Sequence, residues 1–188
     1  MTAEAIDCAT VADWESWLSE HHAERDEVWV RIAKKGSGRR SVTPAEATEA
    51  ALCYGWIDSH RKTGAEGYFF QKYSPRRRGS SWSQINVERA EALMAAGRMR
   101  PPGLAQVEAA KADGRWDAAY EPQRTAQVPA DLAAALAGDE AARRFFESLG
   151  RTDRYAVILR LSKSRGAASR EAQLRKLIDL LRSGQGIS

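Results

Sequence analysis

Cysteine and histidine are scarce in this chain, which has two cysteines and three histidines among 188 residues. Cys8 and Cys53 lie far apart and lack the close spacing of zinc ligands. Three histidines are too few for a histidine-rich metal centre. Two cysteines in an intracellular chain are more often free thiols than a disulfide. We therefore expect free thiols, no metal site and no cofactor.

Long apolar runs are absent as well. No stretch approaches the roughly 20 apolar residues that a membrane-spanning helix needs. The first residues, MTAEAIDCATVADWESWL, are acidic where a secretory signal peptide is basic and then apolar. We therefore expect a cytoplasmic protein with no membrane span.

The motifs of the common catalytic sites are also missing. The sequence contains no P-loop, no G-x-S-x-G, no G-x-G-x-x-G after a predicted strand and no H-E-x-x-H. No familiar reaction class is indicated by a motif. Whether the protein is an enzyme therefore stays open at the level of sequence.

What the chain does have is positive charge arranged in blocks, within a net charge of +4. Residues 28–40 carry five cations and no acid, residues 61–78 carry six cations against one acid, and residues 151–182 carry nine against three. Such blocks attract phosphates or nucleic acid over a Debye length of about 8 Å. The alternative is an ordinary solvated basic surface.

Hydrophobic periodicity predicts an α+β fold. We expect helices at 11–22, 44–53 and 83–97, and strands at 28–34, 56–60 and 68–73 that form a small antiparallel sheet with packed helices. From residue 130 onward, short amphipathic segments predict a C-terminal helical bundle. We therefore expect an α+β sheet unit at 1–128 and a helical region at 129–188 packed on it as one compact unit.

Two helix starts carry capping signals. Thr10 precedes an apolar stripe of Trp14, Trp17 and Leu18, which predicts an N-cap and three buried side chains. Thr43 is followed by proline and, three residues later, by glutamate, the pattern of a capping box.

The sharpest candidate site is the loop that runs from Arg76 through Arg77 to Trp82 and then into a predicted helix. Ser83 is a favourable N-cap, and the first turn leaves backbone N–H groups next to the arginines. The helix dipole and the guanidinium groups both favour an anion there. Ser83 and Asn86 lie on one side of the first turn, so both could reach one bound oxygen. The alternative is that Ser83 only caps the helix and Trp82 only packs.

Trp56, Asp58 and His60 alternate along a predicted strand, so they share the opposite surface if Ile57 points to the core. Trp56 could then form one wall of a ligand site, with Asp58 orienting an anionic or planar ligand. In an alternative interpretation Asp58 or His60 is the base of an uncharacterised enzyme. In a third, the basic loops and aromatic residues form a nucleic-acid or protein interaction module.

Several segments together resemble the YdeI/OmpD-associated family, also called bacteriocin-protection proteins. They are ALCYGWID at 51–58, YSPRR at 73–77, SWSQINV at 81–87, GRM at 97–99, AAKADGRW at 109–116 and TDRY at 152–155. The resemblance implies a link to resistance against bacteriocins or cationic antimicrobial peptides, and it brings no agreed catalytic residues. The recurrent motif positions of the family fall here on Trp56, Asp58, Arg76, Trp82, Ser83 and Asn86.

Overall fold

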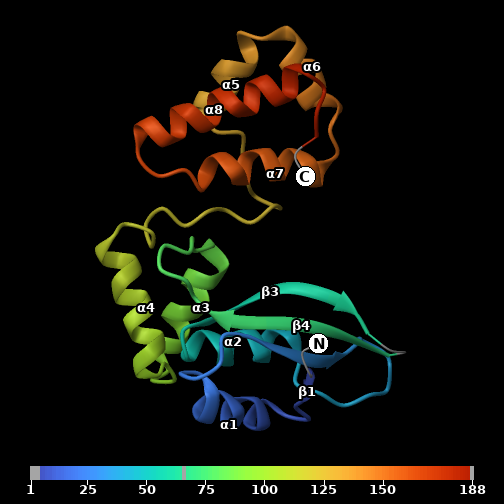
Figure 1. Cartoon of the computed structure of the whole chain (residues 1–188), viewed down its shortest axis with the longest axis vertical. Coiled ribbons are helices and arrows are strands. Elements are labelled where there is room, and N and C mark those ends of the chain that lie inside the picture. The colour runs from blue at the N-terminus through green and yellow to red at the C-terminus, as the bar shows by residue number, and fades with distance from the viewer. Residues whose placement is uncertain (1–4, 65–66, 187–188) are drawn as a thin grey trace. The chain divides into compact units, whose positions relative to one another are not determined.

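The computed structural model describes residues 5–64 and 67–186 and divides the chain into two compact units (Figure 1). The N-terminal unit comprises residues 1–118 and the C-terminal unit residues 119–188. Each unit contains its own cluster of buried apolar side chains. The predicted α+β class is confirmed.

The N-terminal unit is built on a four-stranded sheet. Its strands are β1 (Ala5–Asp7), β2 (Val28–Ala33), β3 (Trp56–Thr63) and β4 (Tyr68–Pro75), in the order β1-β2-β4-β3. β1 is parallel to β2, and the other neighbours are antiparallel. The three predicted strands are present. β1 is an addition, because three residues are too few to show an alternating pattern.

Two helices, α1 (Val11–His21) and α2 (Pro44–Cys53), cover the same face of the sheet (Figure 1). Both begin with a capping box, formed by Thr10 with Asp13 and by Thr43 with Glu46. The hydrogen bond from the Thr10 backbone N–H lowers the pKa of Asp13, and the one from Thr43 lowers the pKa of Glu46. Both predicted helix starts are therefore confirmed.

The core between this face and the helices is rich in aromatic rings. Trp14 is fully buried, and its indole N–H donates to the Ala47 carbonyl oxygen at 3.0 Å. Trp17 stacks on Trp14 with ring centroids 5.3 Å apart but remains partly exposed. Leu18 is buried. The predicted stripe is thus confirmed for Trp14 and Leu18, while Trp17 lies at its edge.

The two cysteines are free thiols, as predicted, and both are buried. Burial raises the pKa of the Cys8 thiol to about 11 and also raises that of Cys53. Among the described residues, no cluster of three or more histidine, cysteine, aspartate and glutamate side chains could hold a metal ion.

Two further helices, α3 (Gln84–Ala95) and α4 (Pro101–Ala112), pack against α2. The backbone N–H of Arg100 donates to the carbonyl oxygen of Cys53 at 3.0 Å, where α2 ends. Gly103 on α4 is buried at this contact, and a Cβ atom there would lie 2.7 Å from the Leu52 carbonyl oxygen and closer still to that of Cys53. The absence of a side chain at Gly103 allows α4 to approach α2 this closely.

The C-terminal unit contains the helices α5 (Ala130–Ala137), α6 (Glu140–Ser148), α7 (Arg151–Ser162) and α8 (Ala167–Arg182). Leu132, Phe146, Val157, Leu161 and Leu177 are among the side chains buried between them. The predicted helical C-terminal region is confirmed. In the part of the chain that the structure describes, no helix combines the length and the apolar character that crossing a membrane requires.

Two arginines of α8 connect it to the start of other helices. Arg170 donates from Nε and Nη2 to the carboxylate of Asp131 at 2.6 and 2.9 Å. Arg182 donates from Nε to Asp139 at 2.6 Å. The Arg170 hydrogen bonds lower the pKa of Asp131. The backbone N–H of Ala142, and then Arg182, lower the pKa of Asp139.

We expect acid to destabilise the C-terminal unit. The folded-state pKa values of Asp131 and Asp139 lie below the unfolded value of about 3.9, so their stabilisation is present above that pH and is lost as the pH falls through the folded values. Thermal unfolding followed by circular dichroism should show a lower midpoint at about pH 3 than at pH 7. Asp131→Asn should reduce this difference. Glu171→Gln is the control, because Glu171 forms only an exposed pair with Arg175 at 3.6 Å. An unchanged pH dependence in Asp131→Asn would contradict the assignment.

Candidate functional site

Arg76, the first residue of the predicted anion site, is buried. Its guanidinium lies 3.7 Å from the ring centroid of Trp82, which is also buried. Its Nη1 donates to the Ser81 carbonyl oxygen at 3.3 Å, and its backbone N–H donates to the Gly55 carbonyl oxygen at 2.9 Å. The buried Arg76 therefore binds backbone groups of the loop and packs beneath it.

A second buried arginine, Arg115, contacts the same loop from a later part of the sequence. Arg115 donates from Nε to both carboxylate oxygens of Asp113 at 2.7 Å and from Nη1 to the Ser80 carbonyl oxygen at 3.1 Å. Trp116 contacts Trp82 with ring centroids 4.9 Å apart. Together, Arg76, Trp82, Arg115 and Trp116 form what we call the Trp82 cluster. Its hydrogen bonds to the loop end on the backbone carbonyl oxygens of Ser80 and Ser81 and so fix the course of the loop.

Ser83 and Asn86 also serve the local structure. The Ser83 hydroxyl oxygen accepts the backbone N–H of Asn86 at 3.3 Å and caps α3. The Asn86 side chain is buried, and its Oδ1 accepts from Arg89 Nη1 at 3.3 Å. Ser83 is therefore the N-cap of α3, as the sequence predicts. Arg77, one residue after Arg76, is exposed.

The strand that carries Trp56, Asp58 and His60 differs from the predicted alternation. Trp56 is 1% exposed, and its indole N–H donates to the His22 carbonyl oxygen at 3.2 Å. The shared surface was predicted on the condition that Ile57 points to the core, and this condition is not met: Trp56 is the core residue and Ile57 is only partly buried. The ring of Trp56 is therefore enclosed by core residues in this structure.

Asp58 and His60 are both exposed on β3. The pairing of β3 with β4 shifts register between Asp58 and Arg61, which marks a β-bulge or similar irregularity. The backbone carbonyl oxygen of His60 accepts from the Gln71 side chain at 3.1 Å. The predicted site residues thus fall into three places: the core at Trp56, the bulge at Asp58 and His60, and the loop next to Trp82.

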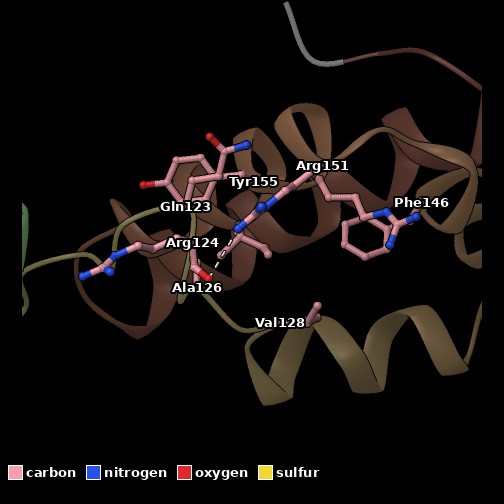
Figure 2. Close-up of a pocket in the computed structure, with 9 residues that line it drawn as sticks. Gln123, Arg124, Ala126, Val128, Phe146, Arg151 and Tyr155 are labelled. Atoms are coloured by element: carbon pink, nitrogen blue, oxygen red, sulfur yellow. Dashed lines mark hydrogen bonds between the residues drawn. The ribbon is translucent and has the colours of Figure 1, made fainter.

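A cavity of about 390 Å³ lies in the C-terminal unit (Figure 2). We call it the Arg151 cavity. Its lining residues are Gln123, Arg124, Ala126, Val128, Phe146, Arg151, Arg154, Tyr155 and Ile158. The lining includes three arginines and no acidic residue, and the apolar side chains Phe146 and Ile158 are buried beneath it.

One face of α7 supplies four of these residues. Arg151, Arg154, Tyr155 and Ile158 follow a spacing of three, four and seven, which places side chains on one side of an α-helix. The other lining residues come from the segment before α5 and from α6. The cavity therefore depends on helix packing within the C-terminal unit alone.

Hydrogen bonds fix several of the polar groups. Arg154 donates from Nη2 to the Glu147 carbonyl oxygen at 2.6 Å and from Nε to the Leu149 carbonyl oxygen at 2.8 Å, which caps the end of α6. Tyr155 donates its hydroxyl to the Glu121 carbonyl oxygen at 2.9 Å. Burial raises the pKa of Tyr155. Tyr155 is therefore a neutral phenol at physiological pH.

Arg151 is held less firmly. Its Nη2 donates to the Arg124 carbonyl oxygen at a long 3.5 Å, and Figure 2 shows its side chain extending toward that backbone while the Arg124 side chain points away from it. Within the described residues, neither arginine forms an ion pair. A guanidinium with one weak neutral partner can turn to a bound anion at little cost.

The start of α7 adds to this positive character. Gly150 is its N-cap and provides no side-chain acceptor, so the backbone N–H groups of the first turn have no capping side chain. The positive end of the helix dipole lies at the same end of the helix as Arg151. Asp153 in the first turn is exposed and offsets part of this charge.

Sequence reasoning missed this cavity but contained signals for it. The block at 151–182 was identified as basic, and Arg151 and Arg154 have helical spacing within it. The residues that close the cavity, such as Val128 and Phe146, come from other segments, which the spacing on α7 does not identify.

Two family models match the chain. The model described as domain of unknown function DUF8412 covers residues 6–106, and the model described as bacteriocin-protection, YdeI or OmpD-associated covers residues 125–184. No curated protein and no solved structure matches. The motifs at 51–87 that carried the resemblance lie within the first match, and TDRY at 152–155 lies within the second. The chain belongs to the DUF8412 family and carries a C-terminal domain of the YdeI/OmpD-associated family.

Proposed function

We propose that the C-terminal unit binds a small organic anion with an apolar group in the Arg151 cavity. The observation that carries this proposal is the lining itself, which joins three arginines and no acid to an apolar base of Phe146 and Ile158. Ligand sites typically combine apolar walls with a few polar groups that orient the ligand. The ligand is still a small anion, as the sequence predicts, but we place it in the Arg151 cavity and not at the loop next to Trp82.

The negative group of the ligand is placed next to Arg151. Arg151 has one weak hydrogen bond to a carbonyl oxygen, and the uncapped start of α7 provides further N–H donors. A carboxylate or phosphate can accept two parallel hydrogen bonds from a guanidinium. Arg154 contributes charge but keeps its bonds to the end of α6.

The apolar group of the ligand is placed against Phe146, Ile158 and Val128. Val128 is 40% exposed, and covering it would favour binding by about 25 cal/mol for each Å² removed from water. The volume of about 390 Å³ falls within the range of small-molecule sites. It suits a single aromatic ring or a short acyl chain.

Calorimetric titration with four probes tests this proposal. Octanoate and octyl phosphate carry both groups, octanol lacks the charge, and inorganic phosphate lacks the apolar part. We expect the first two to bind more tightly than the last two. Arg151→Gln should weaken octyl phosphate binding by about 10- to 100-fold, the equivalent of losing one hydrogen bond to a charged group.

Arg77→Gln is the matched control, and it also tests the anion site that the sequence predicts at the start of α3. Arg77 is exposed beside that helix, so an anion site there remains a second proposal. If Arg77→Gln reduces binding and Arg151→Gln does not, the ligand binds at α3 instead of the cavity. Equal binding of octanol and octanoate would also contradict the proposal.

We also infer a role in protection against bacteriocins or antimicrobial peptides. The support is the description of the family that matches residues 125–184, the region that contains most of the cavity. Cells that carry Arg151→Gln in place of the natural chain provide the matching assay. Survival in the presence of a bacteriocin should fall in these cells if the cavity serves protection.

A further inference from the structure

The second face of the sheet in the N-terminal unit has a composition unlike that of the core face. Val30 and Ile32 of β2 are buried in the cluster with α1 and α2. Trp29 and Arg31 alternate with them and therefore lie on the opposite face. Figure 1 shows α1 and α2 on one side of the sheet. The polar and aromatic face is the other one.

Strand pairing places cations and aromatic rings side by side on this face. Phe70 of β4 is paired with Arg31 of β2 on one side and with Lys62 of β3 on the other. Lys72, two residues further along β4, is paired with Trp29. Because side chains two apart in a strand share a face, these five residues form one patch, which we call the Phe70 patch.

Cations lie over the Trp29 ring of the patch and over the ring of Tyr68, the residue two before Phe70 in β4. The Lys62 Nζ lies 4.3 Å from the ring centroid of Trp29, and the Lys72 Nζ lies 6.0 Å from it. The guanidinium of Arg31 lies 4.9 Å from the ring centroid of Tyr68. Phe70 is partly exposed, and among the described residues no cation lies over its ring. For the residues that the structure describes, Phe70 is therefore the partly exposed ring of the patch that a cation does not cover.

The charge of this region is positive after its ion pairs are counted. Arg31 pairs with Asp7 at 2.5 Å, and Lys72 pairs with Glu27. Lys62 is exposed and forms no ion pair within the part of the chain that the structure describes. The loop after β2 adds Lys34 and Lys35, both exposed, and Arg39, whose guanidinium lies 5.7 Å from the Tyr68 ring centroid.

We propose that the Phe70 patch binds single-stranded nucleic acid. An exposed base stacks on the Phe70 ring, and phosphates contact Lys62 and the cations around it. The interleaving of rings and cations favours this partner over an acidic protein, because every base has a flat face that an aromatic ring can stack on. It also favours a single strand over a duplex, whose bases are already stacked on each other.

Fluorescence anisotropy with a labelled oligouridylate of about 15 nucleotides tests the proposal on the full chain. Phe70→Ala should weaken binding by about 5- to 100-fold, the range for loss of one stacked base. Phe70→Tyr should restore it. Lys62→Gln should weaken binding and reduce the dependence of the logarithm of affinity on the logarithm of salt concentration by about 1.

Lys176→Gln is the charge-matched control, because Lys176 is an exposed lysine of α8 in the other unit. It should bind as the natural chain does, and so should Arg151→Gln, which separates this surface from the Arg151 cavity. Absence of oligouridylate binding overturns the proposal. So does equal displacement by polyglutamate, which has charge but no bases, or unchanged affinity in a folded Phe70→Ala variant. Tighter binding of a duplex of the same length overturns it as well.

Discussion

Replacing Gly103 by alanine should destabilise the N-terminal unit by about 3 kcal/mol or more. The new Cβ would lie 2.7 Å from the Leu52 carbonyl oxygen, and these atoms belong to the backbone of α2. A backbone atom inside a helix cannot move aside as the end of a flexible side chain can. The helices α2 and α4 must therefore move apart at this point. The hydrogen bond from the Arg100 backbone N–H to the Cys53 carbonyl oxygen is then strained or lost.

Denaturant unfolding followed by tryptophan fluorescence measures this effect in the N-terminal unit. All six tryptophans belong to it: Trp14, Trp17, Trp29, Trp56, Trp82 and Trp116. Gly138→Ala is the control, because a Cβ there would meet its nearest neighbour at 3.6 Å and the backbone φ of −84° suits alanine. An unchanged unfolding midpoint in Gly103→Ala would show that α4 does not approach α2 this closely.

Replacing Trp82 by alanine should cost the N-terminal unit about 3–5 kcal/mol, the usual loss for a buried tryptophan. The ring is 1% exposed and lies between the guanidinium of Arg76 and the ring of Trp116. Its removal leaves a cavity and takes away the cation–π contact that accompanies the buried charge of Arg76. Such a loss is comparable with the whole stability of many domains.

The Trp82→Phe variant is the informative partner of this experiment. Phenylalanine keeps an aromatic face against Arg76 and much of the volume, so we expect a clearly smaller loss than for alanine. Unfolding by urea, followed by the fluorescence of the remaining tryptophans, gives both values. If Trp82→Ala retains the stability of the natural chain and changes only ligand binding, Trp82 is part of a ligand site and not of the fold.

The helices and strands could be predicted because their signals are local. A capping box such as Thr43 with Glu46 lies within one turn, and the alternation of Val28, Val30 and Ile32 lies within one strand. β1 was missed because three residues carry no pattern. At β3 the strand itself was predicted, but the irregularity after Asp58 and the burial of Trp56 were not.

The candidate sites were harder to predict because the partner of a charged group is set by tertiary packing. Arg76 next to a helix start predicts an anion site when only neighbouring residues are considered. The ring of Trp116 and the side chain of Arg115, which follow much later in the sequence, show that this loop is packed from within. The Arg151 cavity presents the opposite case. In the sequence its arginines look like an ordinary solvated basic block. Only the folded unit brings the apolar side chains of Val128 and Phe146, which lie in other segments, next to them.

The burial of Cys8 and Cys53 has a consequence for the redox behaviour of the molecule. A thiol with a pKa of about 11 is ionised in only about one molecule in ten thousand at neutral pH, and the thiolate is the form that reacts with oxidants and alkylating reagents. Burial also blocks the approach of such reagents. The folded chain should therefore stay reduced in an oxidising medium. Any disulfide-linked dimer that accumulates there reports molecules whose N-terminal unit has opened.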